Sequence, residues 1–178
     1  MKVLVTGGAG YIGSQLVFEL ASNPEVSEVV VYDNLSGGNY NLFTSHLNKI
    51  AADNIKFIAG DLLDTRKLTA AIEGVDVVYH LAAKRSKPFS NVDSHFFEQV
   101  NHWGTAELVY AVEKANVKRF VFLGSTAIYG PSKGDELHTE TSEANPETFY
   151  GVSKLRGEDH VRRLLEKGDI EVVALRCG

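Results

Sequence analysis

Thr6-Gly7-Gly8-Ala9-Gly10-Tyr11-Ile12-Gly13 follows a β-branched apolar run, and a helical pattern begins inside it. The glycines satisfy two spacings at once: positions 7, 10 and 13 lie at intervals of three, and positions 8, 10 and 13 match the fingerprint of a dinucleotide-binding turn. Because glycine has no Cβ, backbone N–H groups in such a turn can approach a pyrophosphate closely. The alternative is a glycine-rich turn that merely lets a helix pack close to a strand. The strand before the turn and the helix after it favour the dinucleotide interpretation.

Outward from this turn, β-branched runs alternate with longer segments of helical period, as in a parallel sheet with crossover helices. We predict one doubly wound, Rossmann-like α/β domain in three layers, with strands covered on both faces. Strands are expected at Lys2–Thr6, Glu28–Tyr32, Ile55–Ala59, Asp76–His80, Arg119–Leu123 and Glu171–Arg176. Helices are expected at about Ile12–Ala21, Thr65–Ile72, Val92–Ala115 and Phe149–Glu166, with short helices inside the irregular stretches 34–54 and 126–148.

The composition narrows the class of protein. With 44% hydrophobic residues among 178, a net charge of -5 and 4 prolines, the chain suits one folded core rather than a disordered or collagen-like segment. The single cysteine, Cys177, and the lack of a signal-peptide pattern or an apolar run of about 18 residues predict a cytoplasmic protein without a membrane partner. An excess of acidic residues, 23 against 18 basic, argues against nucleic acid.

Acidic and small residues follow the next predicted strands, at the edge where open α/β sheets bind ligands. Twenty residues past the glycine turn comes Asp33. A carboxylate there accepts hydrogen bonds from both ribose hydroxyls and repels a 2'-phosphate, which favours NAD over NADP. Asp61 could contact the adenine, and Ala82 and Ala83 could let a cofactor lie against the backbone. A helix N-cap at Asp61 or Asp64 and ordinary packing of the alanines explain these residues equally well.

Tyr150 and Lys154 stand four residues apart at the start of the last predicted helix, so they share one helical face. A lysine ammonium stabilises a phenolate, which would let Tyr150 act as a general base and acid. Ser125 ends the fifth predicted strand at the same sheet edge and could hydrogen-bond the substrate hydroxyl. Alone, such a Tyr and Lys pair is mostly a chance feature of amphipathic helices. Downstream of a dinucleotide fingerprint, it predicts a hydride-transfer site.

Seven ordered motifs resemble the extended short-chain dehydrogenase/reductase family, the NAD-dependent epimerases and dehydratases. They are Thr6–Gly13, Asp33-Asn34-Leu35, Gly60-Asp61-Leu62, His80–Ala83, Val100-Asn101 with Gly104-Thr105, Ser125–Gly130 and Tyr150–Lys154.

The resemblance implies a nucleotide-sugar substrate, bound NAD that is recycled within each cycle, and Ser125, Tyr150 and Lys154 as catalytic residues. It also implies a supporting role for Asn101 near the active site. Fingerprint and resemblance together assign to the cofactor Gly7, Gly10, Tyr11, Ile12, Gly13, Asp33, Asn34, Asp61, Leu62, Leu81, Ala82, Ala83, Asn101, Tyr150 and Lys154.

The residues after Ser125 bear on the reaction type. The 4,6-dehydratases that this chain resembles carry an acidic pair where it has Thr126 and Ala127, so dehydration is disfavoured. The stretches Asp33–Leu35 and Gly124–Gly130 are most similar to UDP-glucose 4-epimerases, which implies a UDP-sugar and a transient keto group at C4. Simple oxidation or reduction of a sugar carbon uses the same Tyr and Lys and stays open as an alternative.

Members of the family run beyond 178 residues, with a C-terminal region that grips the nucleotide and the sugar. The resemblance therefore implies an NAD-binding domain over residues 1–178 and a truncated substrate-binding domain. An NAD-binding fragment without turnover is accordingly a second hypothesis.

The predicted helix 92–115 carries two further expectations. The resemblance implies a homodimer through this helix, and its apolar positions fit either that contact or a buried face. Phe96, Phe97 and Trp103 fit a helix core better than a stacking platform. The apolar positions of this helix are Val100, Leu108, Val109 and Val112.

The loop before this helix carries three basic residues, Lys84, Arg85 and Lys87. These residues fit a solvated surface better than a diphosphate-binding site.

Overall fold

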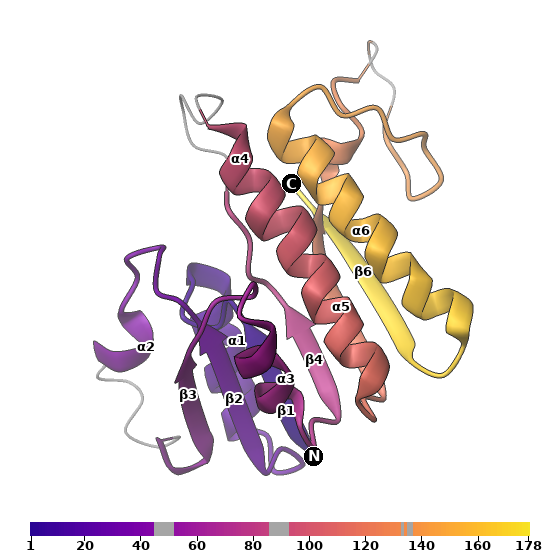
Figure 1. Ribbon diagram of the computed structural model, residues 1–178. Coiled ribbons are helices and arrows are strands. Elements are labelled where there is room, and N and C mark those ends of the chain that lie inside the picture. The colour runs from indigo at the N-terminus through magenta and orange to yellow at the C-terminus, as the bar shows by residue number, and fades with distance from the viewer. Residues whose placement is uncertain (45–51, 86–92, 133, 135–136) are drawn as a thin grey trace.

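The computed structural model describes residues 1–44, 52–85, 93–132, 134 and 137–178, and contains one sheet of six parallel strands. The strand order is β3-β2-β1-β4-β5-β6, so the direction of winding reverses between β1 and β4 (Figure 1). This is the predicted doubly wound fold, and the switch point is where such sheets open a crevice for ligands. The strands are β1 Lys2–Thr6, β2 Glu28–Asp33, β3 Ile55–Ala59, β4 Val77–His80, β5 Arg119–Ser125 and β6 Glu171–Cys177.

Helices cover both faces of the sheet. On one face α3, α5 and α6 bury a core with Leu4, Phe120 and Phe122, and on the other α1 packs on Val3 and Val5. Figure 1 shows α4 and α5 end to end over the first face, with α6 beside them. The helical segments are α1 Tyr11–Ser22, α2 Asn41–Thr44, η2 Ala52–Asn54, α3 Thr65–Ile72, α4 Ser94–Phe97, η4 Glu98–Gly104, α5 Thr105–Lys114, η5 Thr126–Ile128 and α6 Phe149–Lys167.

Local chemistry sets where the helices end. Asp64 caps α3 by accepting a hydrogen bond from the backbone N–H of Lys67, which confirms the N-cap alternative for this residue. Thr148 caps α6 in the same way through the N–H of Gly151. Gly168 ends α6 in the left-handed region, with φ of 74°, where a side chain would be strained.

The predicted helix 92–115 begins outside the described residues, and its described part is not one regular α-helix. Between α4 and α5 lies η4, a π-helical segment with a wider turn. The wider turn shifts which side chains face the sheet. The expectation that Phe96 and Trp103 lie in a helix core is wrong, since they are 51% and 59% exposed, whereas Phe97 is buried as expected.

Two further sequence-based predictions concern which helix and strand positions are buried. The buried-face interpretation is confirmed for Leu108, Val109 and Val112, because they lie in the core under α5, but not for Val100, which is half-buried and lines a cleft. The prediction that every strand is covered on both faces is wrong for β6, where Leu175 is 48% exposed. On the face that carries α1, no helix of the described chain packs on this strand. None of the described helices has the length and hydropathy that crossing a bilayer requires.

Candidate active site

A cleft of about 480 Å³ opens at the carboxyl edge of the sheet, beside the switch point between β1 and β4. With the exception of Asn101, all the site residues predicted from the sequence line it. The predicted cofactor residues and the predicted catalytic residues therefore share one cavity. The lining residues among them are Gly7, Gly10, Tyr11, Ile12, Gly13, Asp33, Asn34, Asp61, Leu62, Leu81, Ala82, Ala83, Ser125, Tyr150 and Lys154.

The glycine turn is packed too tightly for side chains. A Cβ on Gly7 would lie 2.5 Å from the backbone nitrogen of Ala82, and one on Gly13 would lie 2.3 Å from the carbonyl oxygen of Gly7. The close-packing alternative is thus correct for these two glycines. Gly10 is the N-cap of α1 and supplies no capping side chain. The first turn of α1 faces the cleft with N–H groups that an anion could bind.

Asp33 is held at the cleft by backbone donors on both of its oxygens. Oδ2 accepts from the N–H of Ala9 at 3.0 Å, and Oδ1 accepts from the N–H of Leu35 at 2.8 Å. Leu35 has φ of 57°, a left-handed conformation that is uncommon for leucine and had no signal in the sequence. Each carboxylate oxygen keeps a second lone pair, so Asp33 can still accept from a ligand.

Asp61 lies on the same rim. Its side chain accepts from Asn34 Nδ2 at 2.8 Å and from the N–H of Leu63 at 3.0 Å. Its carbonyl oxygen accepts from the Tyr32 hydroxyl at 2.8 Å. Burial, together with the charges of Asp64 and Asp61, raises the pKa of Tyr32 to about 12, so this phenol stays a donor.

Lys154 is buried beneath the end of the cleft that Ser125 and Tyr150 border, with 4% of it exposed. Its Nζ donates to the Leu123 carbonyl at 2.6 Å and lies 4.5 Å from the centre of the Phe122 ring. Burial lowers the pKa of Lys154 to about 8, although the charges of Glu158 and Cys177 oppose the shift. The ammonium is bonded to a carbonyl rather than to Tyr150, so within the described chain the expected pair shares the cleft without a direct hydrogen bond.

Tyr150 and Ser125 border the cleft from different elements. The ring of Tyr150 packs edge-on against Phe97, with centroids 6.1 Å apart. Within the described chain its hydroxyl has no hydrogen-bond partner, which leaves it available to a ligand. Ser125 ends β5, and its Oγ accepts from the N–H of Ala127 at 3.2 Å. The Ser125 proton is therefore free to be donated into the cleft.

A buried ion pair behind Lys154 was missed from the sequence. Glu158 accepts two hydrogen bonds from Arg176, at 3.1 and 2.6 Å, and one from Arg162 at 3.2 Å. Burial alone would raise the pKa of Glu158, but the two guanidinium groups hold it below its usual value. Arg176 also donates to the Tyr129 hydroxyl and to the Glu140 carbonyl. The pair thus ties β6 to α6 and to the segments after Ser125.

Other predicted residues lie at or behind the rim. Lys84 and Arg85 are exposed, as expected of solvated residues, yet they also line the cleft; Lys87 lies outside the described residues. Asn101 is buried behind Lys84 and does not reach the cavity.

Comparisons with known proteins bear on the whole chain. A family model described as "NAD dependent epimerase/dehydratase family" matches residues 3–178. A UDP-glucose 4-epimerase of Lactobacillus helveticus is 37% identical over 179 residues, covering 99% of this chain and 51% of that protein. A dTDP-D-glucose 4,6-dehydratase of Homo sapiens is 34% identical over 178 residues, covering 98% of this chain and 50% of that protein.

Solved structures that resemble this chain are also of nucleotide-sugar epimerases and dehydratases. DesIV, a dTDP-glucose 4,6-dehydratase from Streptomyces venezuelae with NAD and TYD bound, matches with a TM-score of 0.88 and 30% identity, over 99% of this chain and 55% of that one. A UDP-glucuronic acid 4-epimerase from Bacillus cereus in complex with NAD matches with a TM-score of 0.82 and 32% identity, over 99% and 56%. The chain spans about half the length of the curated relatives it matches.

Proposed function

Because the chain belongs to the NAD-dependent epimerase/dehydratase family, we propose that its cleft binds NAD and that the protein epimerises a nucleotide sugar, a UDP-sugar in the first instance, at C4. The observation that carries this proposal is the meeting of three features in one cavity: the uncapped start of α1, the tethered Asp33 carboxylate, and Ser125 with Tyr150 and Lys154. Residues 1–178 are proposed to form the NAD-binding domain.

The described residues fit NAD along the length of the cleft. The uncapped N–H groups of α1 suit a pyrophosphate, and Asp33 suits the two hydroxyls of an adenosine ribose. The bound cofactor would supply the acceptor and donor of a hydride. The proposed contacts are Gly7, Gly10, Tyr11, Ile12, Gly13, Asp33, Asn34, Asp61, Leu62, Leu81, Ala82, Ala83, Tyr150 and Lys154. Asn101, which lies behind this wall, is proposed to support it rather than to touch NAD.

The chain's own residues would move the proton. Tyr150, as the phenolate, would take the proton of the sugar hydroxyl, while the carbon that bears this hydroxyl would lose a hydride to the cofactor. Ser125 would donate a hydrogen bond to the same oxygen, and the Lys154 charge would stabilise the phenolate. After the keto sugar rotates in the site and its carbon takes the hydride back on the other face, Tyr150 would return the proton to the sugar oxygen. Oxidation or reduction without epimerisation uses the same groups and is the second candidate.

The segment after Ser125 supports epimerisation over dehydration. Loss of water from a sugar needs an acid for the leaving hydroxyl and a base for the neighbouring carbon. Thr126 and Ala127 can supply neither, and the Thr126 hydroxyl is directed to the Cys177 carbonyl at 3.4 Å.

We expect the chain to bind NAD at least about tenfold more tightly than NADP, because the Asp33 carboxylate would repel a 2'-phosphate. Asp33→Asn keeps the shape and one oxygen acceptor but removes the charge, so the preference should largely disappear. Calorimetric titration of both cofactors against both proteins measures this. Equal affinity of the unaltered chain for the two cofactors would contradict the placement of the ribose at Asp33.

Turnover should fall as pH rises through about 8. Burial lowers the pKa of Lys154 to about 8, so its ammonium is present below that pH and lost above it. Glu158 raises this pKa, and Glu158→Gln should move the decline to lower pH. The measurement is kcat at saturating NAD between about pH 6 and pH 9.5. A rate that stays constant across this range would remove the charged lysine from the mechanism.

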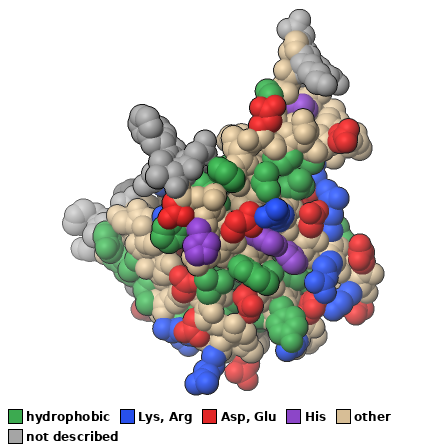
Figure 2. Space-filling model, turned by 45° about the horizontal axis from the view of Figure 1, so that its top comes forward, with side chains coloured by type: hydrophobic (Ala, Val, Ile, Leu, Met, Phe, Trp, Pro, Cys, Tyr) green, Lys and Arg blue, Asp and Glu red, His purple; other side chains and the backbone are tan. Residues whose placement is uncertain are grey.

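A homodimer is also proposed, through the outer face of α4, η4 and α5. Phe96, Trp103 and Tyr110 are 51%, 59% and 52% exposed on these segments. Figure 2 shows hydrophobic, histidine and charged side chains intermixed on the surface that these helices share with α6. An exposed tryptophan flanked by such residues suits an interface.

Trp103→Glu should convert a dimer into a monomer in sedimentation velocity, because a charge would be buried in the contact. Leu137→Glu, at a residue that is 86% exposed in the loop before α6, is the control and should leave the dimer intact. A monomeric parent protein, or a Trp103→Glu dimer, would contradict the interface. The cytoplasmic location expected from the sequence stays a prediction.

A further inference from the structure

Five buried polar residues form a chain of hydrogen bonds from the glycine turn to the catalytic helix. Its members are 0% to 1% exposed, and we call them the buried clamp: Thr6, His80, Thr105, Asn101 and Ser153. Thr6 is the last residue of β1, directly before the glycine turn, and Ser153 directly precedes Lys154 in α6. None of the five lines the cleft. Unlike Asp33 or Tyr150, they cannot touch a ligand there.

The direction of every bond at the His80 end follows from the donors available. Thr105 Oγ1 donates its single proton to the Asn101 carbonyl at 2.7 Å, so toward His80 Nε2, 2.9 Å away, it can only accept. His80 must therefore carry its proton on Nε2. Its Nδ1 then accepts from the Thr6 hydroxyl at 2.7 Å.

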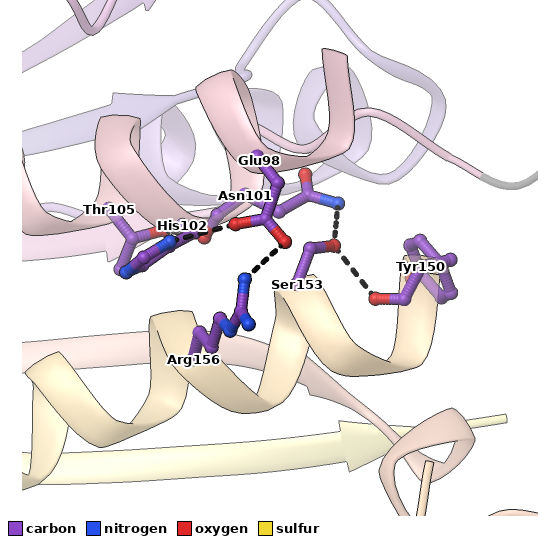
Figure 3. Close-up of polar contacts among 7 residues, drawn as sticks. All are labelled: Glu98, Asn101, His102, Thr105, Tyr150, Ser153 and Arg156. Carbon is purple, nitrogen blue, oxygen red and sulfur yellow. Dashed lines mark hydrogen bonds and ion pairs between the residues drawn. The ribbon is translucent and has the colours of Figure 1, made fainter. Parts of the chain in front are cut away.

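The other end of the clamp is equally determined. Asn101 Oδ1 accepts from the N–H of Lys84 at 2.7 Å, and Nδ2 donates to the Lys84 carbonyl at 3.0 Å, which fixes the amide orientation. Nδ2 also donates to Ser153 Oγ at 3.0 Å, and Ser153 donates to the Tyr150 carbonyl at 2.8 Å. Figure 3 shows Ser153 between Asn101 and Tyr150, with helices η4 and α6 alongside each other.

The two helices can approach closely because of Gly157, where a Cβ would lie 2.4 Å from the Asn101 carbonyl oxygen. A second link, from Arg156 to Glu98 at 2.6 Å, lies on the solvent side of the same contact (Figure 3). The π-helical turn of η4 contains Asn101, and π-turns are frequent at functional sites.

We propose that the buried clamp is the positioning device of the active site, with His80 and Ser153 as positioning residues that hold Tyr150 in register with the cleft wall at Lys84. The proposal rests on the proposed function for its catalytic consequence. A fully satisfied buried polar network specifies one arrangement more sharply than apolar packing does. Both of its outer contacts are with backbone next to groups that line the cleft, the Lys84 peptide and the Tyr150 carbonyl.

The first test needs no turnover. Long-range ¹H–¹⁵N spectra of the labelled chain should show His80 neutral and protonated on Nε2 at both pH 6 and pH 8, with His80→Gln used to assign the signal. Ser153→Ala should speed hydrogen exchange of the Lys84 amide at least about tenfold, because Asn101 loses its anchor on α6. Ser22→Ala, which removes an exposed hydroxyl bonded to the Phe18 carbonyl, should leave that exchange rate unchanged. An Nδ1-protonated His80, or unaltered exchange in Ser153→Ala, would overturn the clamp.

The second test addresses catalysis. Ser153→Ala and Asn101→Asp should each lower kcat at least about tenfold while KM for the nucleotide sugar and Kd for NAD stay within about twofold, since positioning is lost but binding is not. Unchanged kcat, or a loss of NAD affinity in parallel with kcat, would overturn the positioning role. If the unaltered chain turns over no nucleotide sugar, the proposed function fails, whereas the spectra and exchange rates still decide the clamp.

Discussion

Tyr150→Phe is expected to lower turnover of the nucleotide sugar by at least about a hundredfold, the usual contribution of a general base. The substitution removes one oxygen and keeps the ring, so the edge-on packing against Phe97 survives. Kd for NAD should change by no more than about twofold, because the phenol acts on the sugar hydroxyl rather than on the dinucleotide. Single-turnover kinetics with NAD bound, and calorimetric titration of NAD, measure the two quantities separately.

Tyr79→Phe is the matched control for this experiment. Tyr79 lies in β4, is partly buried against the core under α1, and does not line the cleft. Removing the Tyr79 hydroxyl should leave the turnover rate within about twofold of that of the unaltered protein. A Tyr150→Phe protein that turns over as fast as the Tyr79→Phe protein would exclude Tyr150 from the chemistry.

Gly7→Ala should destabilise the fold by roughly 3 kcal/mol or more and abolish NAD binding. Gly7 has φ of 71°, and an added Cβ would collide with the backbone at Ala82, which is 2.5 Å away and cannot move without displacing the cleft wall. The measurements are the free energy of unfolding in urea and the Kd for NAD.

Gly74→Ala separates the two causes. Gly74 also has φ of 71°, but a Cβ there would meet nothing within 4 Å. Only the conformational penalty of about 1 kcal/mol should appear, with NAD affinity retained. Similar losses of stability in the two variants would show that the close approach of Gly7 to the backbone at Ala82, just after β4, contributes nothing specific to stability.

The sheet and the glycine turn could be predicted from the sequence because both depend on local patterns. Apolar β-branched runs placed the six strands to within one or two residues at their ends, as at Glu28–Asp33 and Arg119–Ser125. The tight turn needs glycine whatever the rest of the chain does. The residues of the cleft followed, since parallel strands bring their carboxyl ends to one edge.

Features that depend on tertiary contacts could not be predicted in this way. Trp103 lies in the π-helical segment η4, and an α-helical period in the sequence cannot reveal this segment. Glu158 and Arg176 are eighteen positions apart and meet only because β6 lies beside α6. The left-handed conformation of Leu35 arises from its bond to Asp33, in a turn that has no glycine at that position.

The most direct test of the central claim is to incubate the chain with NAD and UDP-glucose and to separate the nucleotide sugars by chromatography. The account predicts UDP-galactose, formed by the unaltered chain and not by Tyr150→Phe. UDP-glucose that remains unchanged while NAD is shown to be bound would contradict C4 epimerisation of this sugar by the Ser125, Tyr150 and Lys154 site.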